Sequence, residues 1–522
     1  MPIASPHSKG LFPTHGKAIV CFLALSLAVA LPPRNAGAQS ATPTPKNTPI
    51  IQPDEMEVQV DVIKGSQSQT VIGPDFAGLS YEKGYLATGV FDAENTPQVS
   101  LFKRLGPSVF RIGANQVTST HWNASAQGKE YPEIAPSDID RLAAFLKACN
   151  WRVVYAINHA LNTPENAAEE ASYAAKSLGD RLLAFEIGNE PDLYRKKPDH
   201  PERPRPADYS YENFHEEWKS FADAINKAVP NAALVGPSTA GEGKKEKGWL
   251  PLFAKDEGAR ITMLTQHYYI RGAQDPLSSV QDMLTTPEPQ LARMLGNLKT
   301  WVVNNGVKSG FHLNEANSYW GGGKPGLCDS HASALWVLNF LFTCAQNDAC
   351  RGVSLHGGNR APYTPIAYKT SESEVTHKRE GTRPKDHLVI EEIRPEYYGL
   401  SLFAMAAEGA VRETKNTSAA PHNTLFSYAI APKGGGMNVV LVNTSVGTRF
   451  STRLNFGVAV KEATLSRLTG DSLESTTSTR LGGAKITTEG EWTPVPEPLK
   501  SLVDDGLQVS VPPFSAVLIK AR

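Results

Sequence analysis

Leu183-Ala-Phe-Glu-Ile-Gly-Asn-Glu-Pro191 is a largely apolar run that ends in an amide and a carboxylate, Asn189 and Glu190. Gly310-Phe-His-Leu-Asn-Glu315 has the same form, because its β-rich part leads directly into Glu315. Near-continuous apolar runs of this length are typical of strands that are buried on both faces of a parallel sheet. The two stretches therefore predict two buried strands, each with a glutamate at its carboxyl end.

Six further runs of the same kind surround this pair, and longer helical patterns separate several of them. The other strand-like runs are Phe76–Tyr81, Val109–Gly113, Arg152–Asn158, Ala232–Gly236, Ile261–His267 and Gly352–His356. The helical patterns are Ser137–Cys149, Pro164–Ser177, Tyr211–Val229, Glu288–Val303 and Asp329–Ala345. Eight strands that alternate with helices predict an α/β fold, a (β/α)₈ barrel. The alternative is an open, doubly wound sheet, but no glycine-rich dinucleotide-binding loop follows the first run.

Polar residues gather where these runs end. They are Ser80, Tyr81, Glu82, Arg111, Asn115, Asn158, His159, Asn189, Glu190, His267, Tyr269, Asn314, Glu315 and His356. The carboxyl ends of barrel strands form the face that carries active sites. Polar strand ends occur in any fold, so it is their accumulation at seven of the eight runs that favours a site.

The chain changes character after a helix-like segment over Tyr397–Glu408. Short alternating runs then replace the helical patterns, and Glu57–Ile63 near the other end of the chain alternates in the same way. The C-terminal runs are Thr424–Ala429, Met437–Asn443, Thr464–Leu468, Leu507–Val511 and Ala516–Lys520. This pattern predicts an all-β sandwich over residues 409–522, joined by one or more strands from residues 55–72, with the barrel over residues 73–408.

The first 38 residues have the three-part pattern of a secretory signal peptide. Lys9 and Lys17 precede the apolar run Ala18–Leu31, and Ala36-Gly37-Ala38 forms a small-x-small cleavage site. We expect cleavage after Ala38, a flexible linker over residues 39–54, and a secreted or periplasmic protein with no membrane attachment. A buried helix or a membrane anchor fits less well, because the run is short for a bilayer and small residues follow it.

The composition is that of a globular protein, with 40% hydrophobic and 20% charged residues, which excludes a collagen, a coiled coil or a wholly disordered chain. The 52 Lys and Arg and 53 Asp and Glu residues give a net charge of −1, so nothing favours nucleic-acid binding. Four cysteines follow the predicted signal: Cys149, Cys328, Cys344 and Cys350. Cys344 and Cys350 are close enough in sequence for a disulfide, with free buried thiols as the alternative, and the spacing matches no zinc site.

The two glutamates are 125 residues apart, a span that fits the three strand–helix units between the fourth and seventh strands. Either glutamate alone would be interpreted as an ion-paired or helix-capping carboxylate. Two carboxylates at one rim of a barrel suit glycosidic bond cleavage, in which one donates a proton and the other attacks the anomeric carbon or activates water. Unequal solvation and mutual repulsion hold the two pKa values of such a pair apart.

With this pair in register, the chain resembles glycoside hydrolase family 79, the β-glucuronidase and heparanase family of the retaining (β/α)₈-barrel clan A. The matching stretches are residues 110–115, 185–191, 266–269, 314–318 with the glycines at 321–323, 355–358 with Tyr363, 395–398, 439–443 and 511–515. The resemblance extends over residues 56–522. It implies that Glu190 is the general acid/base and Glu315 the nucleophile of a double displacement, without a metal ion or another cofactor.

The resemblance also implies a set of sugar-binding residues. They are Asn189, Tyr269, Asn115, His356, Tyr363, Glu82 and Tyr319. Asn189 would bind the 2-hydroxyl of the sugar, Tyr269 would orient Glu315, and Tyr319 or Trp320 would stack on a sugar face. The alternative for His356 is a buried histidine whose hydrogen bonds are satisfied within the core. The alternative for Tyr269 and Tyr363 is ordinary packing of their rings. Tyr hydroxyls, His and backbone N–H groups would recognise the uronic carboxylate.

With the resemblance, the carboxylate pair implies an exo-acting retaining β-glucuronidase for β-glucuronides or glucuronate-containing polysaccharides. The alternatives are a heparanase-like endo-β-glucuronidase, another clan A β-glycosidase such as a glucosidase or xylosidase, and a catalytically inert carbohydrate-binding protein. A Pro-rich loop after Glu190 carries five basic residues, Arg195, Lys196, Lys197, Arg203 and Arg205. This loop would either contact an anionic leaving group or be a solvated loop balanced by Asp199 and Glu202.

Overall fold

The computed structural model describes residues 54–63, 70–241, 248–286, 288–370, 388–419, 423–457, 460–499, 502–503 and 506–522. The predicted signal peptide over residues 1–38 lies outside the described residues, as does the predicted linker over residues 39–54 apart from Asp54. Within the described ranges, no helix combines the length and the apolar character that a membrane span requires.

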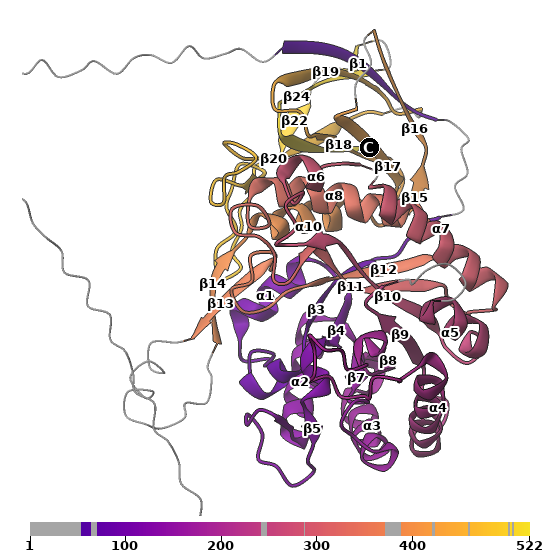
Figure 1. Ribbon diagram of the computed structural model, residues 1–522. Helices are drawn as coiled ribbons and strands as arrows, with labels where there is room; N and C mark the ends of the chain where they lie inside the picture. Colours follow the sequence, from indigo (N-terminus) through magenta and orange to yellow (C-terminus); the bar gives the residue numbers. More distant parts are fainter. Residues whose placement is uncertain are drawn as a thin grey trace, which may run out of the picture. The chain divides into compact units, whose positions relative to one another are not determined.

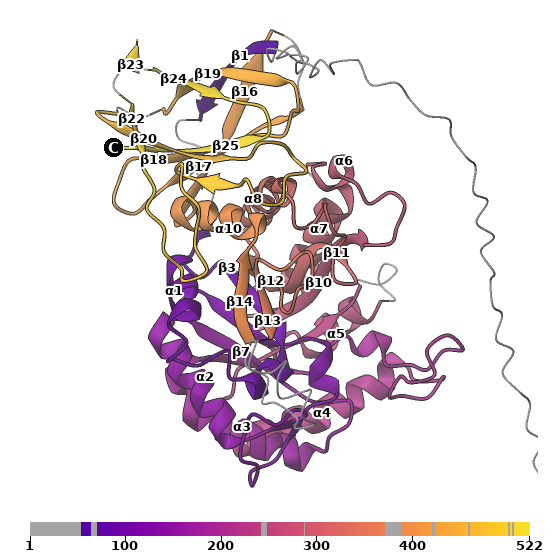
Figure 2. The same cartoon turned by 90° about the vertical axis from the view of Figure 1, so that its left-hand side faces the viewer.

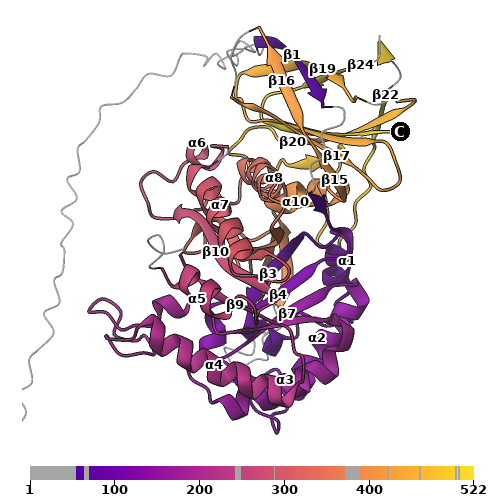
Figure 3. The same ribbon diagram turned by 90° about the vertical axis from the view of Figure 1, so that its right-hand side faces the viewer.

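Eight parallel strands close into a barrel in the order in which they occur along the chain (Figure 1, Figure 3). They are β3 (Ala77–Glu82), β4 (Val109–Gly113), β7 (Arg152–Ile157), β8 (Leu182–Ile187), β9 (Leu234–Thr239), β10 (Met263–Gly272), β11 (Phe311–Trp320) and β12 (Cys350–His356). Pairing of β12 with β3, from Val353 opposite Ala77 to His356 opposite Ser80, closes the ring. Each strand overlaps one of the eight predicted runs, so the predicted (β/α)₈ barrel is confirmed.

Helices surround the barrel and connect its strands. The longer ones are α1 (Thr96–Arg104), α2 (Pro136–Cys149), α3 (Pro164–Leu178), α4 (Tyr211–Ala228), α5 (Trp249–Glu257), α7 (Pro289–Asn304), α8 (His331–Ala345) and α10 (Pro395–Ala406). In α4, the Ser210 side chain accepts the Asn213 N–H at the N-terminus, and Phe214, Trp218 and Ile225 recur at helical spacing and are buried. A cap and an apolar stripe of this kind are what commit such a segment to a helix.

The second part of the structure is a β-sandwich of two sheets (Figure 2). One sheet has the order β16-β1-β19-β24-β23, and the other has the order β2-β15-β17-β18-β25-β20-β21 with β22 beside β20. The bounds are β1 (Asp54–Val62), β2 (Val71–Ile72), β15 (Gly409–Arg412), β16 (Thr414–Ser418), β17 (Leu425–Ala431), β18 (Met437–Asn443), β19 (Thr448–Asn455), β20 (Ala463–Thr469), β21 (Arg480–Leu481), β22 (Glu497–Leu499), β23 (Leu502–Val503), β24 (Gly506–Val511) and β25 (Ser515–Ala521). The prediction of a barrel with an additional all-β sandwich is thus confirmed.

Strand β1 is the member of the sandwich that comes from the N-terminal side of the barrel. It pairs parallel with β19 and antiparallel with β16. Its residues Val58, Val60 and Val62 join Phe450 and Ile519 in the buried core of the sandwich. Alternation of buried and exposed residues places these valines on one face, as expected for a strand that is covered on one side only.

Shorter elements complete the described chain. They are η1 (Lys83–Thr88), η2 (Asn115–Thr118), η3 (Gly179–Arg181), η4 (Pro191–Leu193), α6 (Val280–Met283), the pair β5 (His121–Trp122) and β6 (Glu133–Ile134), and the antiparallel pair β13 (Ile366–Thr370) and β14 (Leu388–Ile393). The segments η1, η2 and η4 begin where β3, β4 and β8 end, so they follow directly on the predicted site residues at the barrel rim.

Helices α8 and α10 lie between the barrel and the sandwich and are buried along almost their whole length (Figure 1). His331, the first residue of α8, bonds through its two ring nitrogens to Thr479 Oγ1 and to the Phe514 carbonyl, at 2.9 Å each. Farther along α8, Asn339 accepts a hydrogen bond of 3.0 Å from the Tyr428 hydroxyl. Specific polar contacts therefore fix the sandwich against these helices.

The disulfide considered for Cys344 and Cys350 is not formed. Cys149, Cys328, Cys344 and Cys350 are all free, buried thiols. Cys344 lies at the end of α8 and Cys350 begins β12, where the Cys350 thiol bonds weakly to the Gly352 carbonyl at 3.7 Å. Burial raises the pKa of Cys344 well above its ordinary value and that of Cys350 to about 12, so both thiols stay protonated.

Candidate active site

Arg111, near the end of β4, connects the predicted site residues to one another. Its side chain is fully buried and donates to Glu315 Oε2 at 2.7 Å, to Asn189 Oδ1 at 2.7 Å and to Glu186 Oε1 at 3.0 Å. A buried guanidinium needs several charged or polar acceptors to offset the loss of water. Arg111 therefore holds the end of β8 and the middle of β11 at fixed positions beside β4.

Glu186 is a second buried group that the sequence did not single out. It lies inside β8, is fully buried, and accepts from Asn314 Nδ2 at 2.5 Å with the oxygen that does not face Arg111. Asn314 also donates to Ser238 Oγ at 2.7 Å. These contacts form a layer beneath the site, and they fix the residue that immediately precedes Glu315 in the chain.

Glu315 lies in β11, and both of its carboxylate oxygens have partners. Tyr269 donates its hydroxyl to Oε1 at 2.8 Å, while Arg111 occupies Oε2. His267 Nδ1 lies 3.8 Å from Oε1 and His356 Nδ1 lies 4.0 Å from Oε2. Although burial opposes ionisation, these two histidines, Arg111 and the Tyr269 hydrogen bond hold the pKa of Glu315 well below its ordinary value. Glu315 is therefore an ionised carboxylate.

Glu190 follows the end of β8 in a left-handed backbone conformation with φ +49°. Such a φ is uncommon for a non-glycine residue and is kept only where the surroundings determine it. Here the Glu190 N–H donates to the Ser238 carbonyl at 2.9 Å, and Oε1 lies 3.0 Å from His267 Nδ1. One oxygen each of Glu190 and Glu315 and a ring nitrogen of His267 all lie within 4.8 Å of one another.

His267 lies between the two glutamates. Burial would lower its pKa, but the neighbouring carboxylates of Glu315 and Glu190 raise it above the ordinary value. A carboxylate–imidazole–carboxylate set of this size has donor atoms that suit a metal ion. The positive charge that a metal would supply is already delivered by Arg111 on Glu315, and we still expect no metal at this site.

Asn189 and Asn115 meet at the rim. Asn189 Nδ2 donates to Asn115 Oδ1 at 3.2 Å, while Asn189 Oδ1 accepts from Arg111. The Asn189 N–H donates to the Tyr194 hydroxyl at 3.2 Å. The structure therefore brings both predicted asparagines to the carboxylate pair and fixes the orientation of the Asn189 amide.

Glu82, His356 and Tyr363 form a second group beside Glu315. The ring of Tyr363 meets that of His356 edge-on with centroids 5.8 Å apart, and it lies 6.2 Å from the ring of Tyr269. Glu82 Oε2 accepts from the Gln116 N–H at 2.6 Å, and Glu82 Oε1 lies 4.0 Å from His356 Nε2. Burial raises the pKa of Glu82 to about 8, and it lowers that of His356. Near neutral pH both side chains are thus uncharged.

Tyr319 is the one predicted sugar-binding residue that does not join these groups. Its hydroxyl donates to Asp282 Oδ2 at 2.9 Å and to the Ser279 carbonyl at 3.0 Å, so it points toward α6. The next residue, Trp320, is 59% exposed at the end of β11. Because side chains alternate along a strand, only one of the two neighbours can face the solvent here. Trp320 therefore suits a stacking surface better than Tyr319.

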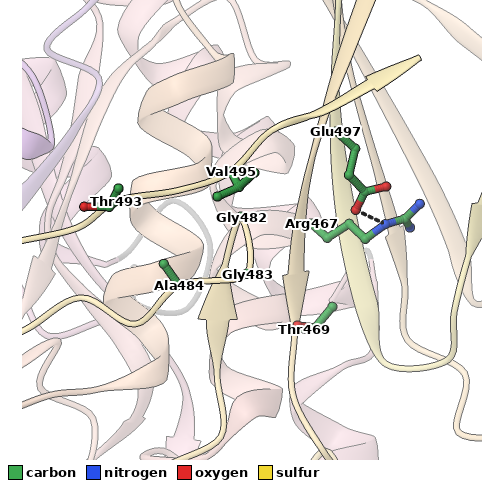
Figure 4. Close-up of a pocket in the computed structure, with 8 residues that line it drawn as sticks. All are labelled: Arg467, Thr469, Gly482, Gly483, Ala484, Thr493, Val495 and Glu497. Atoms are coloured by element: carbon green, nitrogen blue, oxygen red, sulfur yellow. Dashed lines mark hydrogen bonds and ion pairs between the residues drawn. The ribbon is translucent and has the colours of Figure 1, made fainter. Parts of the chain in front are cut away.

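A separate hollow on the sandwich carries none of these features (Figure 4). Its lining residues are Arg467, Thr469, Gly482, Gly483, Ala484, Thr493, Val495 and Glu497. Arg467 and Glu497 neutralise each other through a 2.9 Å contact, drawn as a dashed line in Figure 4. It holds no pair of carboxylates, whereas the rim of the barrel does, and that pair makes the rim the candidate active site.

No family model matches the chain. A β-glucuronidase from Aspergillus niger is 29% identical over 232 residues, which cover 39% of this chain and 41% of that protein. A β-glucuronidase from Neurospora crassa is 25% identical over 376 residues, with coverages of 63% and 64%. A heparanase from Rattus norvegicus is 30% identical over 224 residues, with coverages of 40% and 39%. The predicted resemblance to the β-glucuronidase and heparanase family is confirmed, although each alignment spans less than two thirds of the relative.

Solved structures extend the comparison to the fold. A 4-O-α-L-rhamnosyl-β-D-glucuronidase from Fusarium oxysporum superposes with a TM-score of 0.67 at 15% identity, covering 89% of this chain and 100% of that one. A family 51 α-L-arabinofuranosidase from Bifidobacterium longum gives a TM-score of 0.65 at 14% identity, with coverages of 90% and 100%. At such low identity these likenesses establish a shared fold, and glycosidases with different sugars share it.

Proposed function

We propose that this protein is an exo-acting retaining β-glucuronidase, a glycoside hydrolase that releases glucuronic acid from β-glucuronides or glucuronate-containing polysaccharides. The main support for this proposal is the pair Glu190 and Glu315, which have carboxylate oxygens within 4.8 Å of each other at the barrel rim. Retaining glycosidases hold the two carboxyl groups about 5–5.5 Å apart, and inverting ones about 6.5–9.5 Å apart. The substrate class is inferred from the relatives named β-glucuronidase.

In the first step, Glu315 attacks the anomeric carbon while Glu190 gives its proton to the leaving oxygen. The glycosidic bond breaks, a covalent ester forms between the sugar and Glu315, and the aglycone leaves as an alcohol. The low pKa of Glu315 keeps this carboxylate ionised and ready to attack. Asn189, oriented by Arg111, would bind the 2-hydroxyl of the sugar as the transition state forms.

In the second step, Glu190 acts as a base. It takes a proton from a water molecule, the water oxygen attacks the anomeric carbon, and Glu315 leaves as a carboxylate. The two displacements restore the original configuration. His267, in contact with Glu190 at 3.0 Å, would orient this carboxyl group through both steps.

The uronic carboxylate would be bound by neutral donors. Tyr363 and His356 face the same space as Glu315, and the protonated Glu82 offers a further O–H donor near neutral pH. Hydrogen bonds to a charged acceptor are about twice as strong as those between neutral groups. An acidic sugar can thus be held without a metal ion and without a basic pocket.

Substrate comparison tests the proposal. Aryl β-glucuronide, β-glucoside and β-xyloside are offered at matched concentration, and we expect the glucuronide to be hydrolysed fastest. A preference for the glucoside or xyloside would instead support another clan A glycosidase. If neither the wild type nor Glu315→Gln hydrolyses any of the aryl β-glycosides, the protein is a carbohydrate-binding protein without activity.

Labelling tests the mechanism separately from the substrate preference. A 2-fluoro glucuronide with an activated leaving group traps a retaining enzyme at the covalent intermediate, because the fluorine slows both displacements and the good leaving group restores only the first. Mass spectrometry of peptides should then find the label on Glu315. A label on another residue, with hydrolysis intact, would remove Glu315 from the role of nucleophile.

An endo-acting, heparanase-like activity is the second candidate. The observation that favours it is the loop after Glu190, where Arg195, Lys196 and Lys197 are exposed while Arg205 is held by Glu217 at 3.0 Å. Three free basic side chains suit an anionic polysaccharide on the leaving-group side. Product sizes from a defined oligosaccharide separate the two candidates: single glucuronate units indicate exo action, and internal fragments indicate endo action.

We further propose that residues 1–38 direct export and are cleaved after Ala38, giving a secreted or periplasmic enzyme. Residues 39–54 would be a linker, residues 55–72 would join the sandwich domain, and residues 73–408 and 409–522 would be the barrel and sandwich domains. The N-terminal sequence of the protein recovered from culture medium or periplasm tests the cleavage site.

A further inference from the structure

The loop between β12 and β13, residues 357–365, carries Tyr363 and directly follows His356. Both residues belong to the proposed uronate site, so the position of this loop relative to Glu315 matters for binding. Backbone hydrogen bonds hold part of this loop, because the Gly357 N–H donates to the Ser80 carbonyl at 3.0 Å and the Thr364 N–H to the Ala361 carbonyl at 2.9 Å. Side-chain groups from outside the loop bind several of its other carbonyls.

Asn317 is the first of these groups. It lies two residues after Glu315 in β11 and is buried. Its Nδ2 donates to the His356 carbonyl at 2.9 Å and to the Tyr363 carbonyl at 3.1 Å, while its Oδ1 accepts from the Ser318 N–H at 2.6 Å. One amide thus ties both ends of the loop to the strand that carries the nucleophile.

The start of α10 supplies the second set of contacts. The Arg394 N–H donates to the Pro365 carbonyl at 3.0 Å, and the Arg394 guanidinium donates to the carbonyls of Ala361 and Arg360. Glu396, fully buried, lies 3.3 Å from Asn317 Nδ2, and its other oxygen has no hydrogen-bond partner. Arg394 thus binds the backbone of the loop directly, and Glu396 contacts the Asn317 amide that does the same.

We infer that Asn317 and Arg394 are positioning residues that fix loop 357–365, and thereby His356 and Tyr363, at the distance from Glu315 that a bound uronate requires. Neither touches the carboxylate pair, so they act through the loop. The uronate substrate in this inference rests on the proposed function, whereas the contacts of Asn317 and Arg394 with the loop are features of the described residues.

Chemistry supports a specific role for each group. The amide of Asn317 has two hydrogens, and the two shortest contacts use them on the two carbonyls. Burial raises the pKa of Glu396 well above its ordinary value, so Glu396 is an uncharged acid beside that amide. An isosteric neutral amide at position 396 should therefore be tolerated, whereas removal of the Asn317 amide leaves two buried carbonyls without a donor.

The test compares Asn317→Ala, Arg394→Met and Glu396→Gln with Ser401→Ala as the matched control. Ser401 lies in α10 and donates a buried hydrogen bond to the Tyr397 carbonyl at 2.8 Å, without contact to the loop. Each variant is assayed with an aryl β-glucuronide and the matching β-glucoside, and its melting temperature is measured. A crystal structure of Asn317→Ala reports the loop position without reference to activity.

We expect Asn317→Ala and Arg394→Met to raise KM for the glucuronide by about tenfold or more, with a smaller fall in kcat. The glucuronide-to-glucoside ratio of kcat/KM should fall in both, while Glu396→Gln and Ser401→Ala keep the wild-type ratio. If Asn317→Ala lowers the melting temperature but leaves both this ratio and the crystallographic loop position unchanged, the two residues are merely structural and the inference is wrong. A wild type that never prefers glucuronide would instead overturn the proposed function, and the crystal structure would still decide the inference.

Discussion

The two carboxylates at the barrel rim differ in what surrounds them. Glu315 has a guanidinium on one oxygen and a tyrosine hydroxyl on the other, whereas His267 is the one charged side chain of the described residues that contacts Glu190. A carboxylate with a charged or hydrogen-bonding partner on each oxygen is favoured in its ionised form. A carboxyl group with fewer such partners suits a residue that must give and take a proton. This asymmetry supports the proposal that Glu315 is the nucleophile and Glu190 the acid/base.

Glu190→Gln should separate proton donation from nucleophilic attack. Without an acid, cleavage of an unactivated alkyl glucuronide should slow by roughly 10²–10⁴-fold, the usual contribution of a general acid or base. A glucuronide with a dinitrophenyl leaving group needs no protonation, so its first step should be much less affected. Burst kinetics with the activated substrate checks this, with Glu202→Gln on the exposed loop as the control. Equal slowing of both substrates would contradict the role of Glu190 as acid.

Glu82 should make stability depend on pH. Its pKa is raised by burial from the ordinary 4.5 to about 8, so the folded state keeps a proton that the unfolded chain loses. The stability associated with this proton is complete below about pH 4.5 and is lost as pH rises toward 8. The uncharged Glu82→Gln should therefore gain melting temperature relative to wild type by a few °C between pH 5 and 8. A difference that stays constant over this range would show that Glu82 does not titrate there.

The residues that could be predicted from sequence are those at the ends of apolar runs. Glu190 and Glu315 stand out only as a pair, because two carboxylates at one barrel rim suit glycosidic bond cleavage, whereas either alone could be an ion-paired or capping carboxylate. Glu186 was not singled out because it lies within its apolar run, where alternation alone cannot separate a buried polar group from a core position. Asn317 was not singled out because it lies past the predicted end of its run at Glu315, whereas β11 continues to Trp320. Their partners, Arg111 and the carbonyls at 356 and 363, come from other strands and from the loop after β12, and closure of the barrel brings them close.

At the scale of elements, the cap of α4 offers a direct stability test. Ser210 closes the N-terminus of this 18-residue helix by accepting the Asn213 N–H. Ser210→Ala should lower the free energy of unfolding by about 1 kcal/mol, whereas Ser210→Asp, which can still cap, should stay close to wild type. Denaturant unfolding measures both, and kcat/KM should be unchanged in both because α4 lies outside the barrel rim.

Helices and strands were predicted correctly where the spacing of their apolar residues was clearly periodic. The barrel strands and helices α2, α3, α4, α7 and α8 overlap their predicted ranges. The nine-residue helices α1 and α5 were missed because they are too short for a clear helical period, and strand β19 was missed because its sequence is rich in Arg, Ser and Thr. For β19, pairing with β1 and β24 determines the strand where local preference is weak.

At the scale of the whole molecule, substitutions in β1 test how much this early strand stabilises a sandwich whose other strands come mostly from the last part of the chain. Val60 is fully buried between the sheets, while its neighbour Gln59 is exposed. Val60→Ala should lower the free energy of unfolding by roughly 2 kcal/mol through lost burial, and Gln59→Ala should change it little. Calorimetry checks both variants. If Val60→Ala leaves the free energy of unfolding unchanged, β1 contributes little to the stability of the sandwich.

The position of β1 also sets an order of events during synthesis. The strand is among the first described residues to leave the ribosome, yet its partners β16 and β19 end only at Ser418 and Asn455. The ribosome thus releases all eight barrel strands before the sheet around β1 can form, and until then β1 is an unpaired strand. We expect a chain stopped after residue 408 to leave β1 open to protease, and the full chain to protect it. Equal protection in both chains would contradict this order.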